Sequence, residues 1–146
     1  MQTEGVQCCQ NLSRQADTFE RANVRERGKS IQTIARDLVA LCKAGKFAEA
    51  GEKYWADDVL SVEAMGDMAE SHGKAAARAK GEWWAGAHDV HGVQVEGPYV
   101  NGDQFAVRFV MDITVKESGQ RNKMDEVALY LVKDGKIAEE RFFYSA

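Results

Sequence analysis

The C-terminal part of the chain constrains its fold more than any other stretch. Three β-type runs follow one another there, separated by short turn signals: Gln104–Lys116, Lys123–Lys133 and Lys136–Tyr144. From Phe105 to Val115 every second side chain is apolar, while most of the intervening ones are polar or small. This two-residue period is that of a strand with one buried face. The stretch therefore predicts an antiparallel meander of three strands.

Asp134-Gly135 determines how the last two runs pair. An Asp-Gly dipeptide between apolar runs is a strong hairpin signal, because a type I′ turn needs positive φ at both central residues. If the ladder continues regularly from this turn, Leu129 faces Glu140 in an apolar row that also holds Phe142. The other face then carries an outer cluster: Glu126, Tyr130, Glu139 and Arg141. A slip of one residue would exchange the two faces, so a bulge would reverse which carboxylate faces inward.

The segment before the meander predicts helices and further strands. The clearest helix starts at Ser30, because Ile31, Ile34, Leu38 and Leu41 form an apolar stripe at helical spacing. Other expected elements are a helix over Phe47–Trp55, a strand over Val59–Met65, a short segment over Met68–His72, a helix from Lys74 to about His88 and a strand over Val90–Val100. This order predicts an α+β domain with helices packed on one face of a curved antiparallel sheet.

Residues 1–28 are expected to form a separate N-terminal segment, and residues 29–146 the domain. Asn11–Arg27 carries apolar side chains at helical spacing among many charges, which predicts a weakly amphipathic helix. Two arrangements stay open for this segment: a helical extension that lies on the domain, or a mobile arm.

Composition excludes several classes of function. The chain has 146 residues, which is the size of one domain, and a formal net charge of −4. It has no basic run, so the electrostatic footprint of a nucleic-acid-binding protein is missing. No apolar stretch approaches the ~20 residues that span a bilayer, and the N-terminus lacks the apolar segment of a signal peptide. We expect a cytoplasmic protein that binds neither nucleic acid nor membranes.

No metal or cofactor site is expected either. The three cysteines, Cys8, Cys9 and Cys42, do not have zinc-site spacing and are expected to be unpaired thiols. The three histidines are scattered along the chain rather than clustered with carboxylates. Trp83 and Trp84 do not suggest a cofactor site, so neither kind of group is predicted.

Four short motifs, in their order and spacing, resemble the NTF2-like superfamily, and within it the SnoaL-like and ketosteroid-isomerase-like proteins. The motifs are Tyr54-Trp55-Ala56-Asp57-Asp58, Val62-Glu63, His72-Gly73-Lys74 and Lys133-Asp134-Gly135-Lys136-Ile137. The resemblance covers about Ser30 to Tyr144. It implies a cone-shaped α+β barrel that encloses a pocket, commonly in a homodimer formed through the outer sheet face. The superfamily holds enzymes and non-catalytic binding modules alike, so the fold alone names no reaction.

The resemblance also points to particular residues. It implies that Glu63 takes the place of a carboxylate general base, that Tyr144 matches an aromatic pocket residue, and that Glu140 matches an apolar one. The two donors that would stabilise an oxyanion are missing, because they correspond to Leu38 and Val127. Such donors contribute several kcal/mol to catalysis, so the chain is not expected to be a true ketosteroid isomerase.

Glu63 and Glu140 are therefore the predicted catalytic residues. Two carboxyl groups in one apolar pocket can divide the roles of acid and base, because burial and mutual repulsion separate their pKa values. The alternative is that each is solvated at the mouth or paired with Arg78, Lys80 or Arg108. The predicted ligand-binding residues are Tyr144, Phe142, Met111, Trp83, Trp84 and His72. Trp83 and Trp84 diverge by about 100° on a helix, so only one of them is expected to face the pocket.

Three functions remain open at this point. One is an enzyme that performs acid–base chemistry, of the isomerase, cyclase or hydratase/dehydratase type, on a small apolar organic molecule. Another is a non-catalytic module that binds such a molecule or serves dimerisation. The third is an interaction protein that works through the outer face of the sheet.

Overall fold

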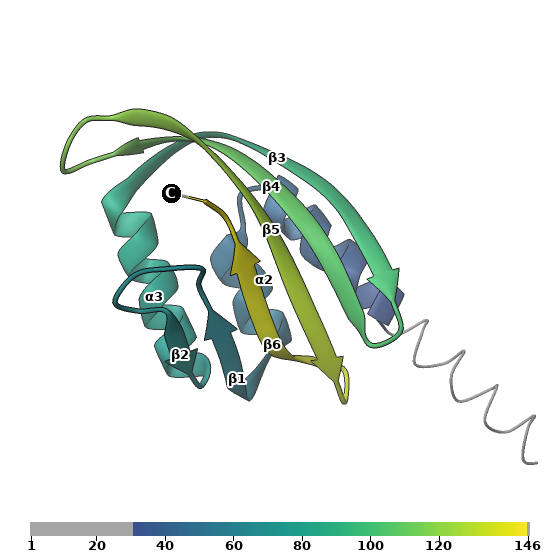
Figure 1. Ribbon diagram of the computed structural model, residues 1–146. Coiled ribbons are helices and arrows are strands. Elements are labelled where there is room, and N and C mark those ends of the chain that lie inside the picture. The colour runs from purple at the N-terminus through teal and green to yellow at the C-terminus, as the bar shows by residue number, and fades with distance from the viewer. Residues whose placement is uncertain (1–30, 146) are drawn as a thin grey trace, which may run out of the picture.

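The computed structural model describes residues 31–145 as helices packed on one side of a curved sheet (Figure 1). The helices are residues 31–43, α2 (Phe47–Tyr54) and α3 (Lys74–Ala87). The strands are β1 (Trp55–Val62), β2 (Glu70–His72), β3 (His88–Asn101), β4 (Gln104–Val115), β5 (Arg121–Lys133) and β6 (Lys136–Phe143). The N-terminal segment predicted over residues 1–28 lies outside the described residues. Among those that are described, no helix combines the length and the apolar character that crossing a bilayer requires.

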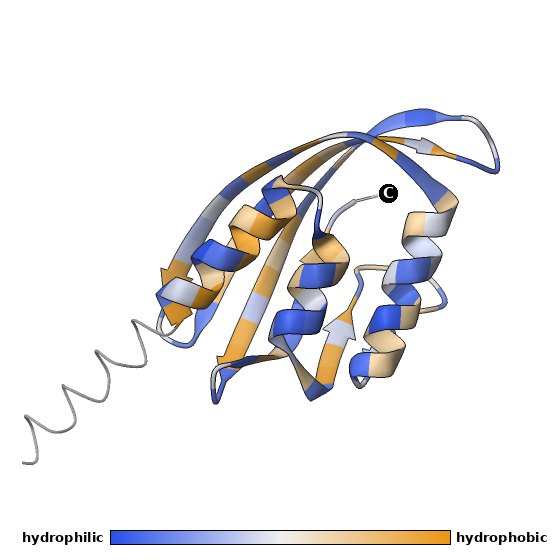
Figure 2. Cartoon of the chain, turned by 180° about the vertical axis from the view of Figure 1, so that it is seen from behind, coloured by the Kyte–Doolittle hydropathy of each residue, from blue (hydrophilic) through white to orange (hydrophobic). Residues whose placement is uncertain are grey.

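One six-stranded sheet runs in the order β2-β1-β6-β5-β4-β3. Seen from behind, the helices lie in front of its concave side (Figure 2). The predicted α+β fold is confirmed, with one difference: β1 pairs parallel with β6, so the sheet is mixed. The two strands lie side by side because the chain returns, after α3 and the long meander, to the strand that it formed before them.

The core follows the alternation predicted for β4. Its inward side chains are buried together: Phe105, Val107, Phe109, Met111 and Ile113. Ile31, Ile34 and Leu38 of the 31–43 helix are buried in the same cluster. Phe105 stacks on Tyr130 of β5, with ring centroids 4.8 Å apart. The helix stripe and the strand row thus meet in one apolar core, which fixes the position of β5 beside β4.

The hairpin turn is as predicted, but the register beyond it is not. Asp134 has φ 51° and Gly135 φ 74°, as the two-residue turn requires. Val132 pairs with Ile137, whereas Leu131 already pairs with Glu139, so Ala138 is an extra residue on β6. This β-bulge shifts the rest of the ladder by one residue.

Because of the bulge, the prediction of the outer cluster was wrong for two of its four residues, Glu126 and Tyr130. Tyr130 pairs with Glu140, and Glu126 and Tyr130 are buried on the concave side of the sheet. Glu139 and Arg141 form an ion pair and are less buried. Glu140 faces inward as predicted, although it does so opposite Tyr130 and not opposite Leu129.

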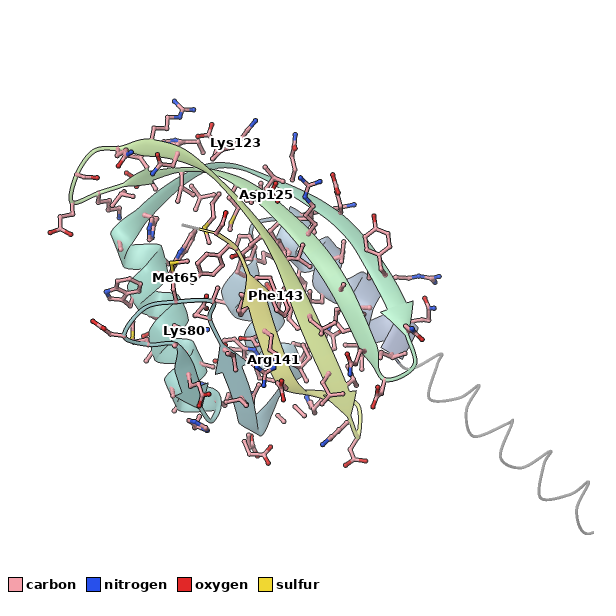
Figure 3. The ribbon with its side chains drawn as sticks, in the orientation of Figure 1. Met65, Lys80, Lys123, Asp125, Arg141 and Phe143 are labelled. Atoms are coloured by element: carbon pink, nitrogen blue, oxygen red, sulfur yellow. The ribbon has the colours of Figure 1, made fainter. Side chains whose placement is uncertain are left out.

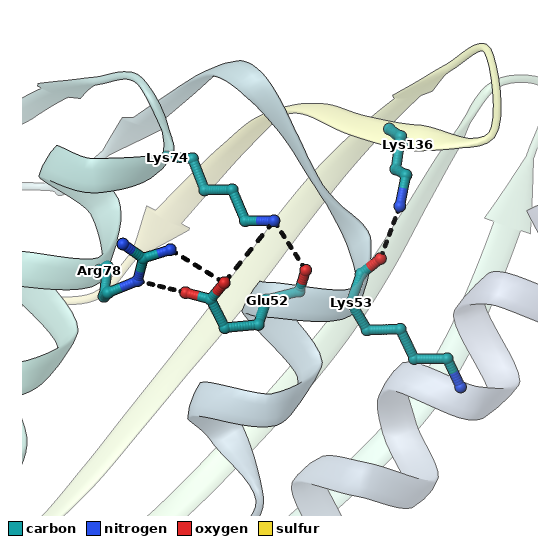
Figure 4. Close-up of polar contacts among 5 residues, drawn as sticks. All are labelled: Glu52, Lys53, Lys74, Arg78 and Lys136. Carbon is teal, nitrogen blue, oxygen red and sulfur yellow. Dashed lines mark hydrogen bonds and ion pairs between the residues drawn. The ribbon is translucent and has the colours of Figure 1, made fainter.

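Polar contacts hold α2 between α3 and β6 (Figure 4). The Glu52 carboxylate accepts two hydrogen bonds from Arg78, one of them 3.0 Å long from Nη2. Lys74 Nζ donates to the main-chain carbonyl of Glu52 at 2.8 Å, and Lys136 Nζ donates to that of Lys53 at 2.8 Å. The two lysine contacts satisfy main-chain carbonyl groups in the last turn of α2, because no further helical turn supplies N–H donors to them.

Candidate functional site

A cavity of about 1470 Å³ lies between the concave side of the sheet and the helices. Much of its wall is apolar, with aromatic side chains from several elements. Phe47 of α2 contacts Phe109 of β4 edge to face, with ring centroids 6.2 Å apart. The apolar lining also includes Leu38, Met111, Met124, Ile137 and Phe142. A cavity of this kind suits a small organic molecule with a large apolar part.

One side of the cavity is lined by the charged groups of Glu63, Lys80, Glu126 and Glu140. Together with Ser61, which Lys80 contacts but which does not itself line the cavity, we call them the polar wall. Ser61 lies on β1, Lys80 on α3, Glu126 on β5 and Glu140 on β6, while Glu63 follows directly after β1. The Glu63 backbone N–H donates to the Ala69 carbonyl at 2.7 Å, which holds this residue in place. Figure 3 labels Lys80 where it projects from α3.

Four of these groups form a hydrogen-bonded chain. Lys80 Nζ donates to Glu63 Oε1 at 2.6 Å and to Ser61 Oγ at 2.5 Å. Since an ammonium group can only donate, Ser61 donates its own proton to Glu140 Oε1, at 2.6 Å. The pairing of Glu63 with Lys80 is one of the alternatives that the sequence left open. In this hydrogen-bonded chain, one cation, Lys80, therefore lies between the carboxylates of Glu63 and Glu140.

Trp55 completes the hydrogen bonding of Glu140. Its indole Nε1 donates to Glu140 Oε2 at 3.0 Å. The Trp55 ring occupies the space beside Gly51 of α2, where a Cβ atom on residue 51 would lie 2.6 Å from ring atoms. Glycine at this helical position therefore lets the ring lie flat against α2 and reach Glu140. Both Glu140 oxygens thus accept hydrogen bonds. Burial nevertheless raises the pKa of this carboxyl above its usual value, because the hydrogen bonds from Ser61 and Trp55 offset only part of the effect of burial.

Glu126 is the exception on the polar wall. Its residue surface is only 8% exposed, and it makes no hydrogen bond or ion pair with any other described residue. It pairs in register with Phe109 of β4, and Ala128, two residues further along the same face, pairs with Phe142. Burial, followed by the negative charge of Glu63, raises the pKa of Glu126 to about 7. Lys80 acts in the opposite direction on this pKa.

The phenols and the thiol beside the polar wall are kept neutral. Burial and the nearby carboxylates raise the pKa of Tyr130, which is fully buried, well above its usual value. Tyr144 donates to Glu63 Oε2 at 3.1 Å, and burial together with Glu63 raises its pKa. Burial and then Glu140 raise the pKa of Cys42 to about 12. These groups therefore stay protonated at neutral pH.

Most of the predicted site residues come together in this cavity. Glu63, Glu140, Tyr144, Phe142 and Met111 all line it. Their side chains come from β4, from β6 and from the residues that follow β1 and β6, so residues far apart in the chain meet at one place. The structure brings together both predicted catalytic carboxylates, with Lys80 and Ser61 between them.

The tryptophans and His72 lie further out. Trp84 stacks on His88 with ring centroids 4.5 Å apart, whereas Trp83 is 58% exposed, and both contribute atoms to the rim of the cavity. His72 does not line the cavity, since its side chain is 74% exposed and lies 3.2 Å from a carboxylate oxygen of Glu70. No group of three or more potential ligands within residues 31–145 is arranged to hold a metal ion.

The sequence did not identify Glu126, Ser61 and Tyr130 as residues of the site. Glu126 and Tyr130 were placed on the outer face because the ladder was extended without a bulge. The sequence held no signal against this choice, since Ala128, Tyr130, Val132 and Ile137 make an apolar row as good as the one that was chosen, but no better. Ser61 lies two residues before Glu63 in the predicted strand, and its side chain is fully buried.

Comparisons with known proteins agree on one family. A family model described as a SnoaL-like domain matches residues 29–144. A crystal structure from Mesorhizobium loti, described as a candidate SnoaL-like polyketide cyclase, is 61% identical with a TM-score of 0.76, and the match covers 78% of this chain and 98% of that one. No curated protein matches the chain.

More distant structures share the fold alone. A candidate SnoaL-like polyketide cyclase from Jannaschia is 18% identical with a TM-score of 0.63, over 76% of this chain and 85% of that one. A Catenulispora acidiphila protein with a ketosteroid isomerase-like fold, crystallised with trimethylamine, is 20% identical with a TM-score of 0.58, over 67% and 74%.

Proposed function

The chain belongs to the SnoaL-like domain family, and on this basis we propose that it is an enzyme that performs acid–base chemistry on a small, largely apolar organic molecule. The observation that carries the proposal is Glu126, a buried carboxyl in an apolar cavity with no hydrogen-bond partner among the described residues. A carboxyl whose pKa is about 7 can both give and accept a proton at neutral pH.

Glu63 and Glu140 have a different role in this proposal. Both are engaged in hydrogen bonds, since Glu63 accepts from Lys80 and Glu140 accepts from Ser61 and Trp55. Their negative charge favours the protonated form of Glu126. Of the three carboxyl groups in the cavity, Glu126 is thus the one that has no hydrogen-bond partner among the described residues and can carry the proton. Isomerisation, cyclisation and hydration or dehydration all need such a carrier.

The test uses two probes built on the same bicyclic ring system. One is 2-tetralone, whose α-protons exchange with D₂O after removal by a base. The other is its methyl enol ether, which hydrolyses after protonation by an acid. We expect the wild-type protein to accelerate at least one reaction, saturably and beyond the rate in buffer, with a pH midpoint near 7. Acceleration of neither probe, with 2-tetralol still bound, would indicate a non-catalytic binding module.

We also propose that the protein forms a homodimer through the outer face of its sheet. Val127 and Phe143 form a cross-strand pair on β5 and β6, and they are 39% and 55% exposed. Figure 3 labels Phe143 on this side of the sheet, together with Lys123, Asp125 and Arg141. A second subunit that covered this face would bury both side chains, and the resemblance to the superfamily implies a dimer formed through this face.

The dimer is tested by one substitution. Phe143→Asp places a charge in the apolar pair and is expected to give a monomer in light scattering, whereas Met68→Asp, on an exposed loop far from this pair in sequence, should leave the mass unchanged. A wild-type protein that is already monomeric at the same concentration contradicts the proposal.

A further inference from the structure

Tyr130 has a hydroxyl group that no other part of the described chain uses. Its ring is held on β5 by stacking on Phe105, with ring centroids 4.8 Å apart, and only 5% of the residue surface is exposed. The hydroxyl forms no hydrogen bond with any other residue from 31 to 145. Because burying a hydroxyl without a partner is costly, an unused one in a protein interior calls for a partner from outside the chain.

The Tyr130 hydroxyl opens into the cavity. Within residues 31–145, no side-chain nitrogen or oxygen that is shielded from solvent lacks a hydrogen-bond partner. The Tyr130 oxygen has no partner, so it must be accessible, and Tyr130 lines the cavity while the rest of its surface is buried. The same reasoning places the carboxyl group of Glu126 at the surface of the cavity.

Two other hydroxyl groups at the polar wall are already engaged with carboxyl groups. Ser61 donates to Glu140 at 2.6 Å, and Tyr144 donates to Glu63 at 3.1 Å. Tyr130 lies opposite Glu140 in the ladder but forms no hydrogen bond with it. Burial raises the pKa of Tyr130 well above its usual value, so the phenol keeps its proton. A ligand can therefore accept a hydrogen bond from this hydroxyl without breaking a contact within the described chain.

The spacing of Tyr130 and Glu126 favours contact with two separate atoms of a ligand. Both side chains lie on the concave side of β5, and Ala128 lies between them on the same face, fully buried. Four residues of strand separate the two Cα atoms by roughly 13 Å. Glu126 and Tyr130 are thus suited to hold different parts of one molecule.

Building on the proposed function, in which Glu126 takes the reacting end of the substrate, we infer that Tyr130 binds a second polar group of the same molecule. The substrate class is then an apolar molecule with two functional groups. One exchanges a proton with Glu126, and the other is an oxygen that accepts a hydrogen bond from Tyr130. An uncharged oxygen, such as that of a ketone, fits best, because burying an anion in an apolar cavity is costly. Tyr130 sets the orientation of the substrate and takes no part in the proton transfer.

The test compares two ligands of nearly the same shape. 6-Acetyl-2-tetralol carries a ketone oxygen on the ring that is distant from its hydroxyl, and 6-isopropenyl-2-tetralol has a methylene group in place of that oxygen. Tyr130→Phe removes the hydroxyl and keeps the ring that stacks on Phe105. We expect this variant to bind the acetyl compound about 3- to 10-fold more weakly than the wild type does, in calorimetry. Its affinity for the isopropenyl compound should stay within about twofold, which also shows that the cavity is intact.

Tyr144→Phe is the matched control, because it removes a cavity hydroxyl that already donates to Glu63. This variant should leave the ratio of the two affinities unchanged. A kinetic measurement separates binding from catalysis. For the methyl enol ether of 6-acetyl-2-tetralone, Tyr130→Phe should raise KM by the same factor and leave kcat unchanged, because the substrate and the transition state accept the same hydrogen bond.

Each outcome decides one question. Equal loss of affinity for both ligands in Tyr130→Phe, or no loss for either, would overturn the role of Tyr130, while the two probe reactions would still decide the proposed function. A lower kcat with an unchanged KM would also overturn it, since Tyr130 would then act in the proton transfer. Selective loss without acceleration of either probe reaction would support Tyr130 as a ligand-binding residue and overturn the enzyme.

Discussion

Glu126→Gln is expected to lower the rate of enol-ether hydrolysis by about 100- to 10,000-fold, because an amide cannot give or accept the proton. The binding of 2-tetralol should change little, since the amide has almost the same shape. The measurement is the hydrolysis rate at saturating probe and a pH of about 6.5, just below the pKa of Glu126. The matched control is Glu139→Gln, on the neighbouring strand, whose carboxylate pairs with Arg141 and does not line the cavity. This control should keep the wild-type rate.

The same variant should be more stable than the wild type at alkaline pH. Burial raises the pKa of Glu126 from about 4.5 to about 7. Between these values the unfolded chain has lost its proton while the folded protein keeps it, so wild-type stability falls as pH rises. Removing the group should therefore raise the free energy of unfolding at about pH 8 by up to about 3 kcal/mol. A variant that is both inactive and less stable at this pH would indicate a structural role for Glu126.

Lys80→Met is expected to lower the free energy of unfolding by about 3 kcal/mol, because it leaves Glu63 and Ser61 without their shared donor. Lys80 and Glu63 are only 12% and 22% exposed, so solvent cannot fully replace the lost contacts. Since Lys80 lowers the pKa of Glu126, its removal should also move the midpoint of the hydrolysis profile to higher pH.

Urea denaturation and the pH–rate profile test this second prediction. Lys46→Met is the control, because Lys46 forms a mostly exposed ion pair with Glu49 and such pairs contribute little. A loss as small as that of the control, together with an unchanged midpoint, would show that Lys80 does not organise the polar wall.

Much of the fold could be predicted from the sequence because its signals are local. The alternation from Phe105 to Ile113 identified the buried face of β4, and Asp134-Gly135 identified the last turn. The start of β1 could not be predicted correctly from the sequence. The strand was expected from Val59, after a turn, but it begins at Trp55, directly after α2, where it pairs with Ile137 of β6. Pairing with a strand so distant in sequence leaves no local pattern.

The candidate site could be predicted only in part, for the same reason. Glu63 and Glu140 were identified as cavity residues, and the structure places both there. Glu126 was assigned to the wrong face because one extra residue, Ala138, reverses every later partner on β5. Both faces of β5 are apolar enough to be buried, so hydrophobic alternation could not decide between them.

The role of Glu126 as the acid is tested most directly by a pH titration of its side-chain carboxyl, followed by ¹³C NMR. Its resonance is assigned as the one that disappears in Glu126→Gln. We expect a midpoint of about 7, coincident with the midpoint of the hydrolysis profile. A midpoint near 4.5, the ordinary value of a solvent-exposed glutamate, would contradict this role.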